Sequence, residues 1–277
     1  MILVTGATGN IGGELVRALA AAGQRVRALT RDGASADLPS GVTQVAGDLN
    51  KPESLRDALA GVNGMFLLPG YQGMARTLAQ AREAGVAHVA LLSGNSAGSG
   101  DTSNAVSAYM IESEATVRES GLDWTIVRPF GFMSNTLQWI PQLQAGDVVT
   151  APFADVPVAM IDPFDIAAVL ALALTAAGHA GQIYPVTGPE SLRPADRVRI
   201  LAGVLGRDLT FRAQPDDEAR AEMSAAMPQK YVDAFFSFYV DGTLDESGPL
   251  PTVAELTGRA PRTFGQWARA HAAAFGG

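Results

Sequence analysis

The sequence predicts an α/β fold in which helices cover both faces of a mostly parallel sheet. In the first 130 residues, short runs of β-branched and aliphatic residues alternate with longer stretches of helical periodicity. Such alternation is typical of consecutive β–α–β units, whose strands lie parallel in one sheet. A glycine-rich turn joins the first expected strand to the first expected helix. Together these features predict a doubly wound parallel sheet of Rossmann type.

Strands and helices alternate strictly in the first half. The first helix carries Ile11, Leu15 and Leu19 on one apolar face. Pro52 falls in the first turn of a later helix, where a missing N–H costs nothing, and Gly85 closes the next. We expect strands at 2–5, 25–30, 42–48, 64–69, 88–93 and 123–129, and helices at 11–22, 51–61, 73–85 and from the polar loop at 94–104 to about residue 120.

The alternation loosens beyond Pro129. Helices are expected at 133–144, 163–177, 194–205, 228–240 and 263–275, and short strands at 147–150, 157–161 and 182–188. No linker or change in composition separates two independent units. We therefore expect an NAD(P)-binding Rossmann domain over residues 1–130 and a smaller C-terminal α/β lobe over residues 131–277. The lobe would bind the substrate and return some of its elements to the sheet.

The composition excludes several classes of function. The formal net charge of −8 repels polyanions and argues against nucleic acid as a partner. The chain has no cysteine, which removes disulfides and thiolate chemistry, and its three histidines lack metal-ligand spacing, so no metal is expected. Neither a signal peptide nor an apolar run of membrane length is present. We expect a cytoplasmic protein, a monomer or a homodimer, that does not bind membranes.

Three glycines, Gly6, Gly9 and Gly12, stand between the first strand and the first helix. The first permits a tight turn, the second lets the backbone approach a pyrophosphate, and the third allows close packing of helix on strand. The start of the helix then directs unpaired N–H groups and its positive dipole at the phosphates. The spacing G-x-x-G-x-x-G therefore predicts a dinucleotide site, with a plain strand-to-helix turn as the alternative.

The residues after the second and third strands bear on the choice of dinucleotide. Arg31 stands where an acidic residue would bind the ribose of NAD, and an arginine there accommodates the 2′-phosphate of NADP. Arg31 makes NADP(H) the preferred cofactor. Because Asp32 could hold the ribose instead, NAD(H) is also possible. Asp48 and Leu49 fall where the adenine would lie, although Asp48 could equally cap the next helix.

A wider likeness over nearly the whole chain is carried by six stretches, VTGATGNIGGELVRALAAAG, VRALTRD, VAGDLNKPESLRDALAGV, ESGLDWTIVRPFGFMSN, YPVTGPESL and LTGRAPRTFGQWARAHAAAF. They resemble the NmrA-like branch of the atypical short-chain dehydrogenase/reductase superfamily, which includes NAD(P)H:quinone oxidoreductases and triphenylmethane reductases. The resemblance implies an oxidoreductase with cofactor contacts at Gly6, Thr8, Gly9, Asn10, Ile11, Arg31, Asp48, Leu68, Pro69, Gly70 and Ser93. It also implies that Pro129, Phe130 and Phe132 lie beside the nicotinamide, unless the phenylalanines only pack at the end of the sheet.

The chain lacks the tyrosine–lysine pair that supplies the catalytic acid in most members of the superfamily. Ordinary members carry Tyr-x-x-x-Lys on the fifth helix, where the lysine lowers the pKa of the tyrosine. Here the corresponding positions are Val106 and Met110, and no lysine occurs between residues 52 and 229. Tyr109 lies one position from the lysine slot and is a candidate proton donor, unless it is a helix-face tyrosine with a buried ring. Tyr109 and Ser93 are therefore the candidate catalytic residues.

The absence of the tyrosine–lysine pair limits the kinds of acceptor that the protein can reduce. Reduction of a simple ketone forms an alkoxide whose conjugate acid has a pKa of roughly 16, so a proton donor must act in the transition state. Reduction of a quinone forms a phenolate-like product whose conjugate acid has a pKa of about 10, which solvent can protonate later. Hydride transfer then needs mainly orientation and an apolar pocket that excludes water. Conjugated acceptors are therefore favoured over alcohols.

Apolar and aromatic residues of the second half supply such a pocket. The candidates are Phe130, Phe132, Met133, Trp139, Phe153 and Met160. A later run, 235–239, carries four aromatic rings that cover more than one helix face, and we interpret it mainly as core. Asp162 and Asp165 are interpreted as a helix cap and a first-turn acid rather than as paired catalytic carboxylates.

The sequence therefore predicts an NADPH-dependent reductase that transfers hydride to a quinone-like or conjugated aromatic small molecule without the usual Tyr-x-x-x-Lys pair. Two alternatives stay open. One is a non-catalytic NADP(H)-sensing regulatory protein, which the missing lysine would suit. The other is a biosynthetic reductase or cyclase that acts on a natural product.

Overall fold

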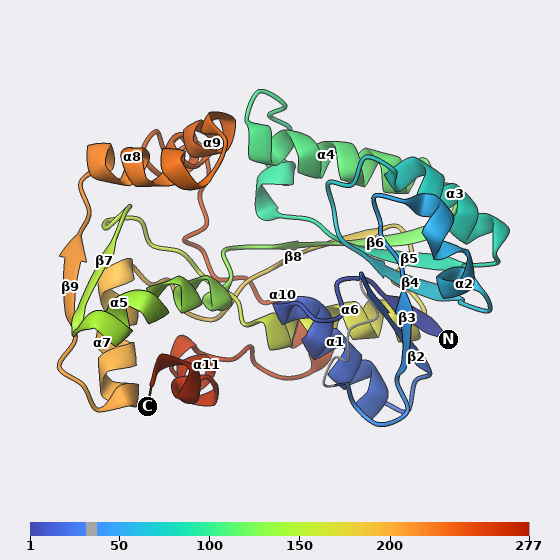
Figure 1. Cartoon of the computed structure of the whole chain (residues 1–277), viewed down its shortest axis with the longest axis horizontal. Helices are drawn as coiled ribbons and strands as arrows, with labels where there is room; N and C mark the ends of the chain where they lie inside the picture. Colours follow the sequence, from blue (N-terminus) through green and yellow to red (C-terminus); the bar gives the residue numbers. More distant parts are fainter. Residues whose placement is uncertain (32–37, 277) are drawn as a thin grey trace.

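The structure, a computed structural model, describes residues 1–31 and 38–276 of the chain. Asp32, the alternative ribose ligand, lies outside the described residues. The described residues form a main sheet of seven parallel strands in the order β3-β2-β1-β4-β5-β6-β8 (Figure 1). These strands are β1 (Ile2–Val4), β2 (Val26–Thr30), β3 (Thr43–Ala46), β4 (Gly64–Leu67), β5 (His88–Leu92), β6 (Asp123–Pro129) and β8 (Gln182–Val186). The predicted doubly wound parallel sheet is confirmed.

The strand order places a ligand site at one edge of this sheet. β1 has β2 on one side and β4 on the other, so the direction in which the sheet grows reverses there. In open α/β sheets, ligands bind at such a switch point, outside the carboxyl ends of the strands. Gly6, Arg31, Leu68 and Ser93 each follow the carboxyl end of a strand near this point. The fold therefore gathers these predicted site residues at one edge.

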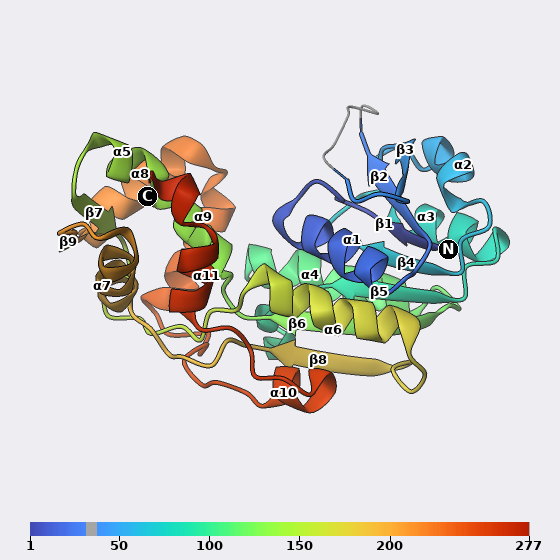
Figure 2. The same cartoon turned by 90° about the horizontal axis from the view of Figure 1, so that it is seen from below.

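Helices cover both faces of the sheet. They are α1 (Asn10–Ala21), α2 (Arg56–Leu59), α3 (Met74–Glu83), α4 (Ala105–Arg118) and α6 (Pro163–Thr175). α1 and α6 pack side by side on one face, where Leu15, Leu19 and Leu170 join one apolar cluster (Figure 2). On the other face, Leu78 of α3 and Val117 of α4 join a second cluster. The sheet is thus buried on both sides, which explains why β4 and β5 are almost wholly apolar.

The second half of the chain builds a smaller lobe beside the sheet, as Figures 1 and 2 show. Its elements are η3 (Met133–Trp139), α5 (Ile140–Ala145), β7 (Val148–Ala151), α7 (Pro194–Leu205), β9 (Thr210–Ala213), α8 (Asp216–Ala226), α9 (Gln229–Tyr239), α11 (Phe264–Ala270) and η4 (Ala272–Phe275). Trp139, Leu201, Phe264 and Trp267 belong to an apolar cluster of this lobe. By contrast, α10 (Thr252–Thr257) packs with α6 and β8 against the main sheet. In the described part of the chain, every helix falls short of the length and apolar character that crossing a membrane requires.

The structure corrects several expected elements. Residues 157–161 do not form the expected strand, because Val158 and Ile161 make only isolated bridges and Pro157 has no N–H to donate to a ladder. The sequence pattern does not reveal β9, α8 or α10, and α8 buries only Ala219. The helices expected at 51–61 and 133–144 each begin as a 3-10 helix, and the polar loop at 94–104 contains another. These are η1 (Pro52–Leu55), η3 and η2 (Asn95–Ser99).

Candidate active site

The turn after β1 has a shape that requires glycine at two positions. Gly6 has a φ of +59°, and a Cβ on Gly12 would lie 2.1 Å from the Gly6 carbonyl oxygen. Thr8, Gly9 and Asn10 are exposed, and no side chain of the described residues caps the first turn of α1. The first N–H groups of α1, together with the positive end of the helix dipole, therefore suit a phosphate group. These residues fit the pyrophosphate of a dinucleotide.

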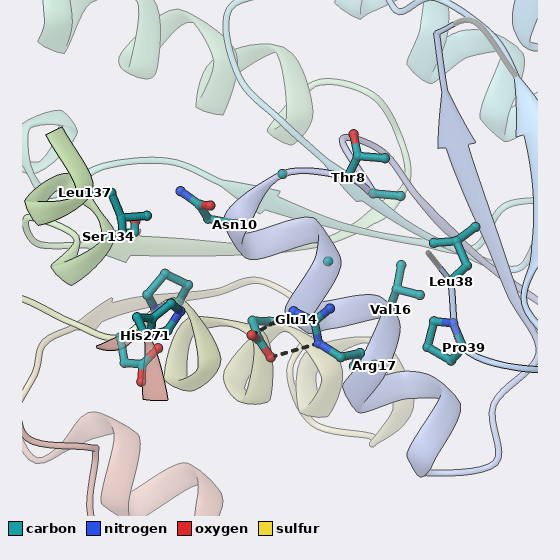
Figure 3. Close-up of a pocket in the computed structure, with 15 residues that line it drawn as sticks. Thr8, Asn10, Glu14, Val16, Arg17, Leu38, Pro39, Ser134, Leu137 and His271 are labelled. Carbon is teal, nitrogen blue, oxygen red and sulfur yellow. Dashed lines mark hydrogen bonds and ion pairs between the residues drawn. The ribbon is translucent and has the colours of Figure 1, made fainter. Parts of the chain in front are cut away.

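A cleft of about 430 Å³ opens beside this turn, and we call it the glycine cleft (Figure 3). Its lining includes Thr8, Gly9, Asn10, Glu14, Arg17, Leu38, Ser134, Leu137, Asp162 and His271. Figure 3 shows Asn10 directed from the start of α1 towards Ser134 and Leu137, both of η3. Glu14 and Arg17 form an ion pair of 2.8 Å along α1. The glycine cleft therefore lies between the start of α1 and the second lobe.

Arg31, Asp48 and Tyr71 lie near one another beyond the carboxyl ends of their strands. Burial raises the pKa of the Tyr71 phenol, the charge of Arg31 lowers it, and the charge of Asp48 raises it. Asp48 is also fixed in its own loop, because its carboxylate accepts the backbone N–H of Asn50 at 2.9 Å. Leu49 is buried and Arg31 is exposed. Tyr71 is not among the predicted site residues, and its only signal in the sequence is its position shortly after β4.

The segment after β4 approaches both the glycine turn and α4. Leu68 lies so close to Gly6 that a Cβ on Gly6 would stand 2.7 Å from Leu68 Cδ1. Pro69 is half-buried, and the ring of Tyr109 on α4 lies against the exposed Gly70. Burial raises the pKa of Tyr109, and a neighbouring tyrosine raises it further, so the phenol keeps its proton at neutral pH. Tyr109 thus stands beside predicted cofactor residues, although it is not among the described residues that line the glycine cleft.

Ser93 belongs to a buried charged network that the sequence analysis does not identify. Its hydroxyl donates to Glu114 Oε1 at 2.7 Å, and Arg128 donates two hydrogen bonds of 2.7 and 2.6 Å to the same carboxylate. Burial alone raises the pKa of Glu114, but these hydrogen bonds and the charges of Arg128 and Arg118 lower it below its usual value. The proton of Ser93 is therefore directed at an ionised carboxylate. The sequence signal for this network is the i, i+4 pair of Glu114 and Arg118 on α4.

A second cleft, of about 650 Å³, lies in the second lobe, and we call it the aromatic cleft. Its lining includes Gly131, Ser134, Trp139, Phe153, Val158, Met160, Arg197, Glu222, Met223, Met227, Phe235 and Tyr239. Three of the predicted pocket residues, Trp139, Phe153 and Met160, therefore share this cavity. Ser134 lines both clefts, so the two cavities adjoin.

The other predicted pocket residues lie next to the aromatic cleft rather than in its described lining. Pro129 and Phe130 are buried at the end of β6, and Phe132 is half-buried against the core of the main sheet. Met133 is buried in the cluster of the second lobe, and its N–H donates to the Ile161 carbonyl at 2.9 Å. These residues connect the sheet to the second lobe.

The aromatic run at 235–239 divides between core and cleft. Phe235 and Tyr239 line the aromatic cleft, whereas Phe236 is buried and packs against Phe153 with ring centroids 5.3 Å apart. Phe153 has a φ of +55°, in the left-handed region that costs a residue other than glycine roughly 1–2 kcal/mol. Backbone strain of this kind concentrates at functional sites, so it marks the wall of the aromatic cleft as a candidate.

Two ionisable groups of the second lobe, Arg197 and Glu246, are further residues that the sequence analysis does not identify. The guanidinium of Arg197 lies over the Trp139 ring, 5.1 Å from its centroid, and burial lowers its pKa to about 10. Burial raises the pKa of Glu246 to about 7, although the Gly131 N–H and contacts that include Tyr239 lower it. Burial also raises the pKa of Tyr239, and the charge of Glu246 adds to the effect. The aromatic cleft therefore has a guanidinium and a phenol in its wall and a carboxyl group next to it.

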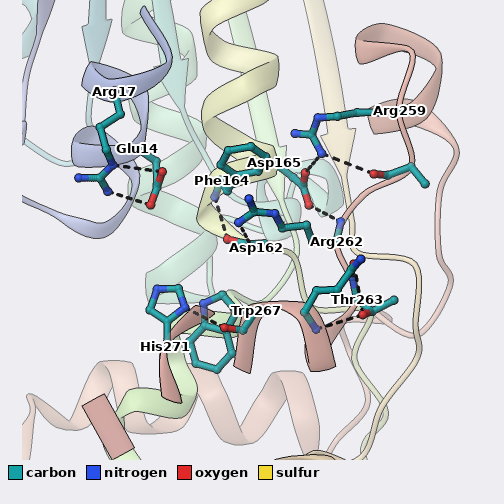
Figure 4. A network of polar contacts seen from close by, with 12 residues as sticks. Glu14, Arg17, Asp162, Phe164, Asp165, Arg259, Arg262, Thr263, Trp267 and His271 are labelled. Atoms are coloured by element: carbon teal, nitrogen blue, oxygen red, sulfur yellow. Dashed lines mark hydrogen bonds and ion pairs between the residues drawn. The ribbon is translucent and has the colours of Figure 1, made fainter. Parts of the chain in front are cut away.

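Asp162 and Asp165 attach the C-terminal segment to the start of α6 (Figure 4). Asp162 accepts the Phe164 N–H at 2.9 Å and caps the helix, as the sequence predicts. Asp165 is fully buried and accepts hydrogen bonds from the Arg259 side chain at 2.6 Å and from the Arg262 N–H at 2.7 Å. Arg262 also lies over the Phe164 ring, 3.6 Å from its centroid. The two carboxylates are therefore part of the framework, although Asp162 borders the glycine cleft.

Comparisons with known proteins identify the family of this chain and similar structures. The model of the NmrA-like family matches residues 1–256. A relative from Streptomyces griseus subsp. griseus, named (4-alkanoyl-5-oxo-2,5-dihydrofuran-3-yl)methyl phosphate reductase, is 41% identical over 99% of each chain. An NAD(P)H azoreductase from Xenophilus azovorans is 39% identical over 100% of this chain and 99% of its own. The structure of the NADPH-dependent quinone oxidoreductase QOR2 from Escherichia coli with NADPH has the same fold, with a TM-score of 0.79 at 22% identity over 98% of this chain and 99% of that one.

Proposed function

This chain belongs to the NmrA-like family, and we propose that it transfers hydride from NADPH to quinone-like or otherwise conjugated aromatic molecules. Relatives that span the whole chain are named as an NAD(P)H azoreductase and as a (4-alkanoyl-5-oxo-2,5-dihydrofuran-3-yl)methyl phosphate reductase. The chain is accordingly an NAD(P)H-dependent oxidoreductase that uses NADP(H). What we propose beyond this is the class of acceptor, a quinone-like or conjugated aromatic molecule.

The observation that carries the proposal is the junction of the two clefts at Ser134. The glycine cleft begins at the exposed start of α1, and Ser134 lines both it and the aromatic cleft. A dinucleotide with its pyrophosphate at the start of α1 can therefore extend towards a cavity walled by Trp139, Phe153 and Phe235. A volume of about 650 Å³ suits a small aromatic molecule.

When bound, NADPH supplies the hydride from its reduced nicotinamide ring. The residues of the chain orient the acceptor and shield it from water. The aromatic walls stack on a flat ring and exclude solvent, which favours hydride transfer to a conjugated acceptor. The ionised Glu114, held by Arg128, fixes the hydroxyl of Ser93 at the carboxyl end of β5.

We propose Tyr109 as the proton donor for acceptors that need one, because its phenol stays protonated and its ring lies against Gly70. Hydride addition to a quinone forms a phenolate-like product whose conjugate acid has a pKa of about 10. Hydride addition to an unsaturated lactone without an acyl substituent forms an ester enolate, a much stronger base that needs a proton donor. Tyr109→Phe should therefore lower kcat by less than about threefold with a quinone and by about 100-fold with the lactone. Steady-state rates with both acceptors measure the difference. A loss of equal size with both acceptors would contradict this assignment.

We infer that the chain divides into a cofactor-binding domain, residues 1–130, and a substrate-binding lobe, residues 131–277. Residues 1–130 contain the glycine turn, Arg31 and Ser93, and residues 131–277 contain the whole described lining of the aromatic cleft. β8 belongs to the second range but is the edge strand of the main sheet, and α6 of the same range covers one face of that sheet. The proposed substrate lobe is therefore anchored to the cofactor domain through the sheet itself.

A second candidate function is a biosynthetic reductase of a conjugated lactone. The name of the Streptomyces griseus relative, which describes an oxo-dihydrofuran methyl phosphate, favours it. Both candidates require hydride transfer to a conjugated acceptor in the aromatic cleft. They differ in which acceptor is reduced fastest.

The test is to mix the purified protein with NADPH and a panel of quinones, azo dyes and unsaturated lactones, and to follow the loss of nicotinamide absorbance. Gly12→Val, whose side chain would collide with the Gly6 carbonyl, is the control that cannot keep the glycine turn. We expect turnover with at least one class of acceptor and none with a folded Gly12→Val variant. Binding of NADPH without reduction of any acceptor would make the reductase proposal wrong and favour a sensing role.

A further inference from the structure

Arg197 is a cation in the wall of the aromatic cleft with no anionic partner among the described residues. It projects from the first turn of α7, and its guanidinium lies over the ring of Trp139. Its Nε is buried and, among the described residues, has no hydrogen-bond partner. The ion pairs of the described part of the chain all involve other arginines.

Two other partly buried arginines of this protein are matched to carboxylates. Arg128 donates two hydrogen bonds to Glu114, and Arg259 forms an ion pair with Asp165 at 2.6 Å. Burial lowers the pKa of Arg197 to about 10, so its guanidinium is still charged at neutral pH. A partly buried charge without a counter-ion is unfavourable, because its lost hydration is not fully offset. The site is therefore electrostatically incomplete without a ligand.

The groups around Arg197 do not supply the missing charge. Tyr239 stays neutral, because burial raises the pKa of its phenol. Glu246 interacts with Tyr239 and, among the described residues, forms no ion pair with Arg197. Glu222 also lines the aromatic cleft, but it is exposed and accepts a hydrogen bond from Gln214 at 2.7 Å. Most of the remaining wall is apolar or aromatic. A ligand that complements both the apolar wall and the charge of Arg197 has a flat apolar body and an anionic group.

We propose that Arg197 is an anion-binding subsite of the aromatic cleft, and that the substrates are conjugated molecules carrying a phosphate, sulfonate or carboxylate group. The inference rests on the proposed function, since it assigns a substrate class to the same cleft. A guanidinium binds such oxyanions through paired N–H donors, and stacking on Trp139 holds it in position. The dinucleotide phosphates are assigned to the glycine cleft, whose described lining does not include Arg197.

The test compares a naphthoquinone with its sulfonate as acceptors for the wild type and for Arg197→Met. The methionine keeps much of the length of the side chain and removes its charge. We expect Arg197→Met to lower kcat/KM for the sulfonate by about 10- to 100-fold and to change it by less than about twofold for the neutral quinone. Because each acceptor is compared with itself across the variants, their different reduction potentials cancel.

Two further variants separate the subsite from general effects of charge. Arg197→Lys keeps a cation and should recover part of the preference for the sulfonate. Arg199→Met removes a cation from the exposed face of the same helix and should leave both acceptors unchanged. A loss of sulfonate preference in Arg199→Met would overturn the assignment to Arg197.

The thermal midpoint distinguishes a ligand subsite from a structural arginine. Without ligand, Arg197→Met should unfold at the same Tm as the wild type or at a higher one, because an unpaired buried charge has been removed. A lower Tm together with equal losses for both acceptors would show a purely structural role and overturn the proposal.

A binding measurement keeps this inference separate from the reductase proposal. Naphthalene sulfonate, which the enzyme cannot reduce, is titrated into the wild type and Arg197→Met, with tryptophan fluorescence as the signal. Binding that is saturable in the wild type and at least about tenfold weaker in the variant supports the subsite, even if no acceptor is ever reduced. Equal affinity in both proteins, or an unchanged ratio of kcat/KM between the acceptors, would overturn it.

Discussion

At the scale of single residues, Glu246 links the stability of this protein to pH. Burial raises the pKa of its carboxyl group from 4.5 to about 7, while the Gly131 N–H and contacts with Asn95 and Tyr239 lower it and the charge of Asp245 raises it. The folded protein therefore holds this proton more tightly than the unfolded chain does. Between these two pKa values the folded state binds more protons, so the free energy of unfolding falls as the pH rises.

Glu246→Gln should remove this dependence on pH. Above the folded pKa, we expect the variant to be more stable than the wild type by at most about 3 kcal/mol, since one pKa unit corresponds to about 1.4 kcal/mol. Below the unfolded pKa, the two proteins should be equally stable. Urea unfolding at about pH 4 and about pH 8 measures the difference. Glu255→Gln, at an exposed position of α10, is the matched control and should keep the wild-type slope. A wild type whose stability relative to Glu246→Gln rises with pH would contradict the account.

We propose that the choice between NADPH and NADH depends on Arg31. It is exposed at the carboxyl end of β2, where its guanidinium can reach a 2′-phosphate. Arg31→Ala should raise the Kd for NADPH by about 10- to 100-fold and leave that for NADH nearly unchanged. Calorimetric titration measures both values, and Arg25→Ala, an exposed arginine just before β2, is the control. Equal losses for the two cofactors would remove this assignment.

At the scale of elements, the start of α6 is the point at which the C-terminal segment is attached. The buried Asp165 holds the side chain of Arg259 and the backbone of Arg262 (Figure 4). Asp165→Asn should lower the free energy of unfolding by about 3 kcal/mol, because it removes one partner of a buried ion pair. Asp147→Asn breaks the more exposed pair with Arg207 and should cost less than about 1 kcal/mol. Urea unfolding of both variants tests this, and similar losses would contradict it.

The elements also show where sequence patterns succeed. The strand at 123–129 and the helix at 194–205 have the bounds that the sequence predicts, and Pro194 and Gly206 delimit that helix. These signals act through local backbone conformation. The strand expected at 157–161 fails, because an apolar alternation does not show whether a partner strand is present. The sequence pattern does not predict α8, because this helix is mostly polar and buries only Ala219.

At the scale of the whole molecule, the cofactor should stabilise the fold by binding only the folded state. NADPH at about 100 times its Kd should add about 2.7 kcal/mol to the free energy of unfolding and raise the Tm. A thermal scan with and without NADPH measures the shift, and a folded Gly12→Val variant should show none. An unchanged Tm of the wild type at saturating NADPH would contradict the dinucleotide site.

Local sequence alone determined the parallel sheet, the glycine turn at Gly6 and Gly12, and the caps such as Asp162. The glycine turn and the caps depend on backbone sterics and hydrogen bonds within a few residues, which the order of amino acids specifies directly. The parallel sheet follows from the alternation of strand and helix patterns along the chain. The candidate cofactor residues follow from the same signals. In a parallel sheet, the residues that follow the carboxyl ends of the strands all lie at the same edge of the sheet.

Only the tertiary structure decided which polar residues stand at the aromatic cleft and which charges are matched. Ser93, Glu114 and Arg128 come from three different elements, and Arg197 meets Trp139 from another part of the chain. Whether a charge is buried, paired or open to a ligand depends on distances between segments far apart in the sequence. Those distances arise only when the elements within each lobe pack together, so no local pattern distinguishes Arg197 from an arginine in solvent.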